Sequence, residues 1–115
     1  MKSMLRIGRL LACMSVLASA VPAAQAEDYP TRPVRMIVPY APGGAPDVLA
    51  RSLAPGLSEF FKQQFVIENR PGAGGIGAAE SVVRAAPDGQ VLFFSDIQQL
   101  AINPYLFAKL PYAAD

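Results

Sequence analysis

The sequence predicts an α/β fold in which a parallel sheet is built in β-α-β-α-β order. Three short apolar runs, at residues 34–38, 65–69 and 91–95, alternate with helix-like segments over short connections. Strands that alternate with helices in this way pair in parallel, and strands covered on both faces are apolar throughout. Ligands of such sheets bind beyond the carboxyl ends of the strands, so the loops after the three runs form the candidate site.

The first run, VRMIV, lies between Pro33 and Pro39 and is predicted to be a strand. The loop PYAPGGAPD follows, and we expect Asp47 to be the N-cap or a first-turn acid of the next helix. Proline removes a backbone donor, so we expect Pro55-Gly56 to kink this helix or to divide it into two shorter pieces. Apolar residues at spacings of three and four predict that the helix is amphipathic, namely Leu49, Leu53, Leu57, Phe60 and Phe61.

The second run, FVIEN, is predicted to be a strand that leads through a glycine loop into a helix around residues 77–85. A turn signal, Pro87-Asp88-Gly89, precedes the third predicted strand, VLFFS. The segment after it is expected to be helical as far as Asn103-Pro104, with a second short helical piece beyond the proline.

The first 26 residues have the order of a secretory signal peptide. A basic start is followed by an apolar stretch from Leu10 to Val21 and by an A-x-A site that ends at Ala26. We expect cleavage after Ala26, which would place residues 27–115 in the periplasm as one ligand-binding segment. The competing interpretation, a lipoprotein with its lipid on Cys13, would leave almost no apolar segment before the cysteine.

Composition narrows the chemistry of the predicted mature segment. Residues 27–115 contain no cysteine and no histidine, which excludes disulfides, thiolate chemistry and histidine-based metal sites. Their net charge of −2 offers no basic surface for nucleic acid. We predict neither a metal nor a cofactor. As separate expectations, the chain is a binding protein and not an enzyme, and it is a monomer.

The stretch Gly72–Gly77 fits the dinucleotide fingerprint G-x-G-x-x-G, with Asp96 near the position of a ribose-binding acid. A secreted dinucleotide-dependent oxidoreductase is therefore one alternative. Against it, Asn69-Arg70-Pro71 separates the strand from the first glycine, which normally turns directly off the strand. Two Gly-Gly loops that each lead into a helix instead predict backbone amides that bind an anion such as a small carboxylate.

Three longer stretches, among them VIENRPGAGGIGAAESVVRAAPDG and LAINPYLFAKLPY, resemble the Bug family, the extracytoplasmic solute receptors of tripartite tricarboxylate transporters. The resemblance implies the first lobe of a two-lobed, type II periplasmic-binding-protein fold that closes on a small organic acid and delivers it to membrane permease subunits. It also implies that main-chain groups and ordered water hold a carboxylate. By position this role falls on Tyr40, Ala41, Pro42, Gly43, Gly44 and Ala45 in the first loop, on Ala73, Gly74, Gly75 and Ile76 in the second, and on Ser95 and Asp96 in the third.

The chain departs from the family pattern at two loops and in length. Pro46 removes one amide donor from the first loop. Asp96 begins the third loop; we favour a helix-capping role, while an Asp96 facing the ligand would repel a second carboxylate and favour an amine or amide. Tyr40 is either a packing residue or an aromatic wall of the cleft. The match covers only the beginning of a first lobe, so we expect an incomplete fold without a second lobe; a nonfunctional remnant or a small interaction module is the further alternative.

Overall fold

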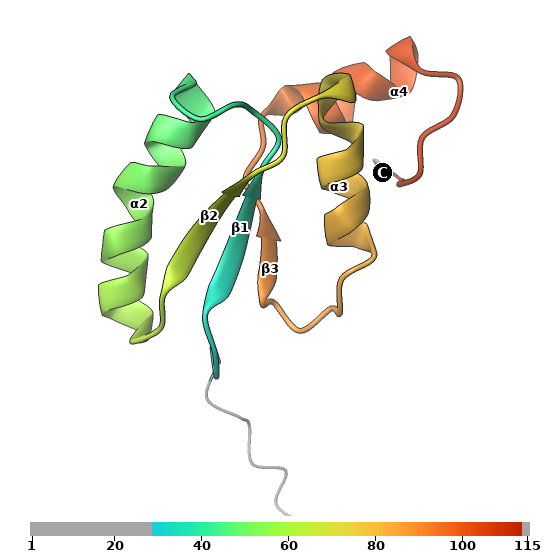
Figure 1. The fold of residues 1–115 in the computed structure, drawn as a ribbon. Helices are drawn as coiled ribbons and strands as arrows, with labels where there is room; N and C mark the ends of the chain where they lie inside the picture. Colours follow the sequence, from blue (N-terminus) through green and yellow to red (C-terminus); the bar gives the residue numbers. More distant parts are fainter. Residues whose placement is uncertain (1–28, 114–115) are drawn as a thin grey trace, which may run out of the picture.

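The computed structural model describes residues 29–113, so the predicted signal peptide and its cleavage site lie outside the described residues. The elements follow one another in the predicted alternating order (Figure 1). They are β1 (Val34–Val38), α2 (Ala45–Phe61), β2 (Phe65–Asn69), the 3₁₀ turn η1 (Ala73–Gly75), α3 (Ile76–Val83), β3 (Val91–Phe93), the π-helical segment η2 (Gln98–Ile102) and α4 (Asn103–Leu106).

The three strands form one parallel sheet in the order β2-β1-β3, which confirms the predicted fold class. Val34 of β1 pairs with Phe65 of β2, and Arg35 pairs with Val91 of β3. The third strand is shorter than predicted and ends at Phe93, although Phe94 N–H still donates to the carbonyl oxygen of Ile37 at 2.9 Å. All three strands point towards the same edge, where the loops, η2 and α4 gather (Figure 1).

One face of the sheet packs against α2 and forms the hydrophobic core. Val34, Met36 and Phe65 from the strands meet Ala54 from the helix, with Leu57, Phe61 and Ile67 partly buried around them. The predicted apolar stripe of α2 is therefore wrong in part, because Leu49, Leu53 and Phe60 are exposed. The helix instead buries Ala50 and Ala54, whose small side chains permit close approach to the sheet.

One of the two outcomes expected at Pro55-Gly56, a division of α2 into two shorter pieces, is wrong. Helix α2 runs unbroken through Pro55 for 17 residues. Its packing on β1 and β2 outweighs the single backbone hydrogen bond that proline removes. The helix ends at Lys62, which adopts a left-handed conformation with φ of 56°.

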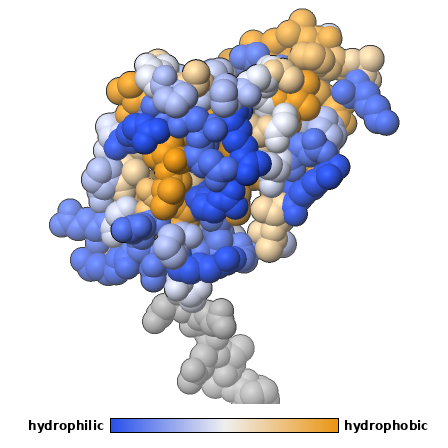
Figure 2. Space-filling model, viewed as in Figure 1, coloured by the Kyte–Doolittle hydropathy of each residue, from blue (hydrophilic) through white to orange (hydrophobic). Residues whose placement is uncertain are grey.

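Helix α3 packs against β1 and β3, and its Ala78 and Ala79 are buried. Hydrophilic residues cover most of the face drawn in Figure 2, with apolar residues grouped between them and over α4. Tyr105 and Leu106 of α4 are among the exposed apolar residues. Between residues 29 and 113, no helix has the length and apolar character needed to cross a membrane.

Candidate functional site

The three loops singled out by the sequence lie beyond the carboxyl ends of the three parallel strands. Residues 40–44 follow β1 and lead into α2, residues 70–75 follow β2 and lead into α3, and residues 94–97 follow β3 and lead into η2. A parallel sheet places the carboxyl ends of its strands at one edge. Side-chain hydrogen bonds join the three loops there, as described next.

The first loop is fixed by Asp47, which lies in the first turn of α2, while Gly44 holds the N-cap position. The Asp47 side chain is almost fully buried. Its carboxylate accepts a hydrogen bond from Gly43 N–H at 2.8 Å and one from Asn69 Nδ2 at 2.8 Å. Arg51 Nε lies 3.0 Å from both carboxylate oxygens. One buried carboxylate thus joins the loop after β1, the start of α2 and the end of β2.

These contacts set the charge state of Asp47. The Arg51 guanidinium, then Gly43 N–H and the Asn69 amide, lower the pKa of the Asp47 carboxyl from 3.8 to about 2. Asn69 also donates to the carbonyl oxygen of Tyr40 at 3.1 Å and accepts from Arg51 Nη2 at 2.9 Å. Asp47 is therefore an ionised acceptor that holds the loop, and Gly43 N–H, a predicted ligand donor, is already paired with it.

The second loop turns tightly around its glycines. Gly72, Gly74 and Gly75 have φ values of 113°, 63° and 75°, a region that residues with a side chain rarely adopt. Gly75 N–H donates to the carbonyl oxygen of Gly72 at 2.8 Å, and Ile76 N–H donates to that of Ala73. Gly75 is buried, and Ile76 is partly buried at the start of α3.

Two buried amide side chains converge on the carbonyl oxygen of Gly74. Gln99 Nε2 donates to it at 3.1 Å and Asn103 Nδ2 at 2.8 Å, and both side chains are fully buried. Tyr112 adds a further layer, because its hydroxyl donates to the carbonyl oxygen of Gln99 at 2.8 Å. The segment η2–α4 therefore locks the peptide between Gly74 and Gly75.

The third loop is held by the first residues of η2 and lies beside Tyr40 of the first loop. Ser95 Oγ donates to Gln99 Oε1, and the Asp96 carboxylate accepts from Gln98 N–H at 2.9 Å. This last bond gives Asp96 the favoured capping role at the start of the helical segment. Tyr40 is half-buried, and its hydroxyl lies 3.4 Å from both Gln98 Oε1 and Gln99 Nε2. Burial and then the nearby Asp96 carboxylate raise the pKa of the Tyr40 hydroxyl.

The amides of the predicted site fall into two groups. Those of Gly43, Gly44, Gly75 and Ile76 are paired inside the chain, which differs from their predicted role as free donors. Those of Ala45 and Asp47 at the start of α2, and of Ala73 and Gly74 at the start of η1, have no acceptor among residues 29–113. Ala41 and Pro42 are exposed on the first loop. The start of α2 and the turn η1, in which Ala73 and Gly74 have φ values of 46° and 63°, thus keep unpaired donors at one edge of the sheet.

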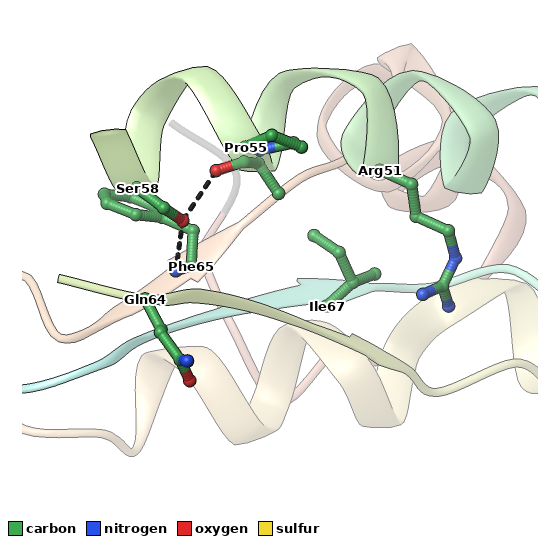
Figure 3. A pocket seen from close by; sticks show the side chains of 7 residues that line it. Arg51, Pro55, Ser58, Gln64, Phe65 and Ile67 are labelled. Atoms are coloured by element: carbon green, nitrogen blue, oxygen red, sulfur yellow. Dashed lines mark hydrogen bonds between the residues drawn. The ribbon is translucent and has the colours of Figure 1, made fainter. Parts of the chain in front are cut away.

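A groove of about 480 Å³ lies elsewhere, between α2 and the outer strand β2 (Figure 3). Its walls are mostly apolar, with Pro55, Phe65 and Ile67 among them. Ser58 Oγ at its end is already paired, donating to the carbonyl oxygen of Ala54 at 2.7 Å and accepting from Phe65 N–H at 2.9 Å. This groove brings no set of free polar groups together.

Sequence reasoning missed four side chains that shape the loops, namely Arg51, Asn69, Gln99 and Asn103. Asn69 carried a usable signal, because a polar residue at the carboxyl end of an apolar strand faces the loop region. Asn103 was interpreted only as part of a helix break before Pro104. Residues 29–113 contain no group of three or more acidic, cysteine or histidine side chains that could hold a metal ion.

The fold and the site define a class of protein. It is a parallel α/β unit whose three loops meet beyond the carboxyl ends of the strands, the place where open α/β sheets bind their ligands. Residues 49–115 match the family model described as the tripartite tricarboxylate transporter family receptor, TctC. The chain belongs to this family, and the resemblance to Bug receptors is confirmed.

Known relatives support the assignment. The chain is 42% identical over 108 residues to protein BugT of Bordetella pertussis, covering 90% of this chain and 33% of BugT. Among solved structures it resembles MatC of Rhodopseudomonas palustris with bound malate, with a TM-score of 0.71, 38% identity, and coverage of 75% of this chain and 29% of MatC. R. palustris Rpa4515 with adipate gives a TM-score of 0.71 at 37% identity, with the same coverage of both chains. The chain spans about a third of the length of the curated relatives that it matches.

Proposed function

We propose that the chain forms the beginning of the first lobe of a periplasmic receptor that captures a small carboxylate for a tripartite tricarboxylate transporter. The observation that carries the proposal is a set of amides at one sheet edge, those of Ala45 and Asp47 at the start of α2 and of Ala73 and Gly74 in the turn η1, which have no acceptor among the described residues. Unpaired amides at a helix start favour an anion. The ligands named for MatC and Rpa4515, malate and adipate, are both carboxylates.

The family match favours a receptor over the oxidoreductase that the Gly72–Gly77 fingerprint suggested. The same glycines make a tight turn whose carbonyl at Gly74 is occupied by two side-chain amides. In the proposal, residues 1–26 direct export and are removed after Ala26. The remaining segment acts as a monomer. The complete receptor delivers the bound acid to a membrane permease.

The affinity expected of this chain follows from the start of α2 and the unpaired amides of η1. The helix start contributes up to about 2 kcal/mol to a partly buried anion, and hydrogen bonds from the η1 amides to a charged group contribute about 2 kcal/mol more. Together about 4 kcal/mol corresponds to a Kd near 1 mM. A second lobe that closes over the ligand would add contacts and bring the Kd towards the micromolar range.

The test is a titration of the 115-residue chain with malate and with adipate, followed through backbone amide chemical shifts. We expect the largest shifts at the amides of Ala45, Asp47, Ala73 and Gly74, and none with a diamine of similar length. If both acids at about 10 mM, tenfold above the expected Kd, leave these amides unmoved, the proposal is wrong.

A glycine substitution provides the matched variant. Gly44 has an ordinary φ of −69°, and a Cβ there would lie 3.4 Å from the carbonyl oxygen of Ala41, so a side chain fits the fold. Gly44→Val would cover the start of α2 and should weaken binding about tenfold or more, equivalent to about 1.4 kcal/mol. Gly56→Val, at an exposed position of α2 with no atom within 4 Å of the new Cβ, is the control and should bind like the parent chain.

A further inference from the structure

Gln99 is the one side chain of the described residues whose polar atoms reach all three loops at the carboxyl edge of the sheet. Its Oε1 accepts from Ser95 of the third loop. Its Nε2 donates to the carbonyl oxygen of Gly74 in the second loop at 3.1 Å and lies 3.4 Å from the Tyr40 hydroxyl beside the first. The side chain is fully buried.

A buried glutamine is costly unless its polar atoms are paired, and apolar side chains of similar size fill space without that cost. Filling space therefore does not account for an amide at this position. Each contact of Gln99 instead falls on a different loop of the candidate site. Neighbouring Asn103 shares only one of these contacts, the Gly74 carbonyl oxygen, and its other partner is Tyr112 near the end of the described chain.

Gly75 shows how closely the second loop is fitted to Gln99. A Cβ placed on Gly75 would lie 2.5 Å from Gln99 Nε2, inside the distance at which atoms can pack. The glycine lets the backbone approach the amide until Gly74 can accept its hydrogen bond. The glycines that fit the dinucleotide fingerprint therefore allow the second loop to lie close to the Gln99 side chain.

We propose that Gln99 is a positioning residue that couples the three ligand-binding loops, so that an anion bound at one helix start also restrains the other two loops. The proposal rests on the proposed function for its ligand, but the coupling itself belongs to the free chain. Removing Gln99 should release all three loops together, whereas removing one of its partners should release one loop.

Amide hydrogen exchange, measured by NMR on the 115-residue chain without ligand, tests the coupling. The reporters are the paired amides of Gly44 in the first loop, of Gly75 in the second, and of Gln98, which donates to the Asp96 carboxylate of the third loop. The reference in the sheet is Arg35 N–H, which donates to the carbonyl oxygen of Gln90 at 2.9 Å. In Gln99→Leu we expect exchange about tenfold faster at all three reporters and unchanged at Arg35, since each loop loses a hydrogen bond to the buried Gln99 side chain. Gln64→Leu, the same substitution at an exposed position, should change none of them.

Two results in Gln99→Leu would overturn the coupling. One is faster exchange at Gly75 alone, and the other is an increase in the exchange rate of Arg35 as large as the increase in the loops. If Gln99→Leu does not fold, Ser95→Ala and Tyr40→Phe each remove one contact of Gln99 without emptying the core. The first should speed exchange at Gln98 and the second at Gly44, with Gly75 unchanged in both; no change at these reporters would refute the proposal.

Malate added to the same samples separates this inference from the proposed function. Malate that shifts the loop amides of the parent chain should shift them several-fold less in Gln99→Leu at equal concentration. Faster exchange at all three loops with no malate response in the parent chain would support the coupling and contradict carboxylate binding. Equal malate shifts in the parent chain and in Gln99→Leu would contradict the positioning role.

Discussion

Gly75→Ala is the substitution for which the structure gives the clearest expected cost. Gly75 has a φ of 75°, and a new Cβ would lie 2.5 Å from Gln99 Nε2 and 2.8 Å from Pro39 Cβ. The left-handed conformation costs about 1–2 kcal/mol for a residue with a side chain, and overpacking of this kind costs about 1–3 kcal/mol. We therefore expect Gly75→Ala to lower the free energy of unfolding by about 2–5 kcal/mol.

Thermal unfolding of the 115-residue chain, followed by circular dichroism, measures this cost. For a unit of this size 1 kcal/mol corresponds to about 4–8 °C in Tm, so a fall of at least about 8 °C is expected. Gly77→Ala is the matched control: no atom lies within 4 Å of its new Cβ and it sits in the first turn of α3, so it should raise stability by about 0.5–1 kcal/mol. Equal melting of Gly75→Ala and the parent chain would refute the close packing of the second loop on Gln99.

Three further predictions concern α2 and its contacts. Because the pKa of Asp47 is lowered in the folded chain from 3.8 to about 2, its contribution to stability is present above the unfolded value and is lost as the pH falls towards 2. The free energy of unfolding, measured with urea across that pH range, should fall in the parent chain and fall less in Asp47→Asn. An equal fall in both proteins would contradict the lowered pKa of Asp47. Pro55→Ala restores a backbone donor inside a continuous helix and should raise the urea midpoint by the equivalent of about 1–3 kcal/mol, whereas an unchanged or lower midpoint would show that proline costs this helix nothing. Ser58→Ala leaves Phe65 N–H without its 2.9 Å acceptor and should cost about 1–3 kcal/mol in the same assay; a cost below about 0.5 kcal/mol would mean that water replaces the hydroxyl.

The alternation of apolar runs and helical segments was enough to predict the order of the elements along the chain and the parallel direction of the strands, but not the order β2-β1-β3 within the sheet. Short connections leave few ways to join a strand, a helix and the next strand except in parallel. The buried side of α2 was harder to predict, because large apolar residues stood on two neighbouring sides of the helix. Ala50 and Ala54 are buried, whereas Leu49 and Leu53 remain exposed. Small residues that permit close contact carry little signal in a pattern based on hydrophobicity.

The meeting of the three loops at one edge of the sheet could also be predicted, because it depends on topology alone. The side chains that hold the loops could not, since Gln99 and Asn103 lie 25 and 29 residues from Gly74 along the chain. Pattern analysis treats polar residues in a helical segment as solvent-facing, and only tertiary packing turned these two amides inward. The pairing of Gly43 N–H with Asp47 could have been predicted, because the two residues are only four positions apart. A carboxylate at the third position of a helix is a known acceptor for an amide that precedes the helix.

A negative side chain at the start of α2 bears directly on whether that helix start can attract an anion. A bare carboxylate there would oppose a second negative charge, and the few tenths to about 2 kcal/mol that a helix start contributes would not suffice. Arg51, however, lies 3.0 Å from both oxygens of Asp47, and Asn69 and Gly43 donate to the same group. Since the pKa of Asp47 is about 2, this pairing persists across the pH range in which a dicarboxylate is charged. An approaching anion therefore meets a neutralised pair beside the unpaired amides of Ala45 and Asp47, and the same carboxylate that removes Gly43 from the set of donors keeps the remaining donors in place.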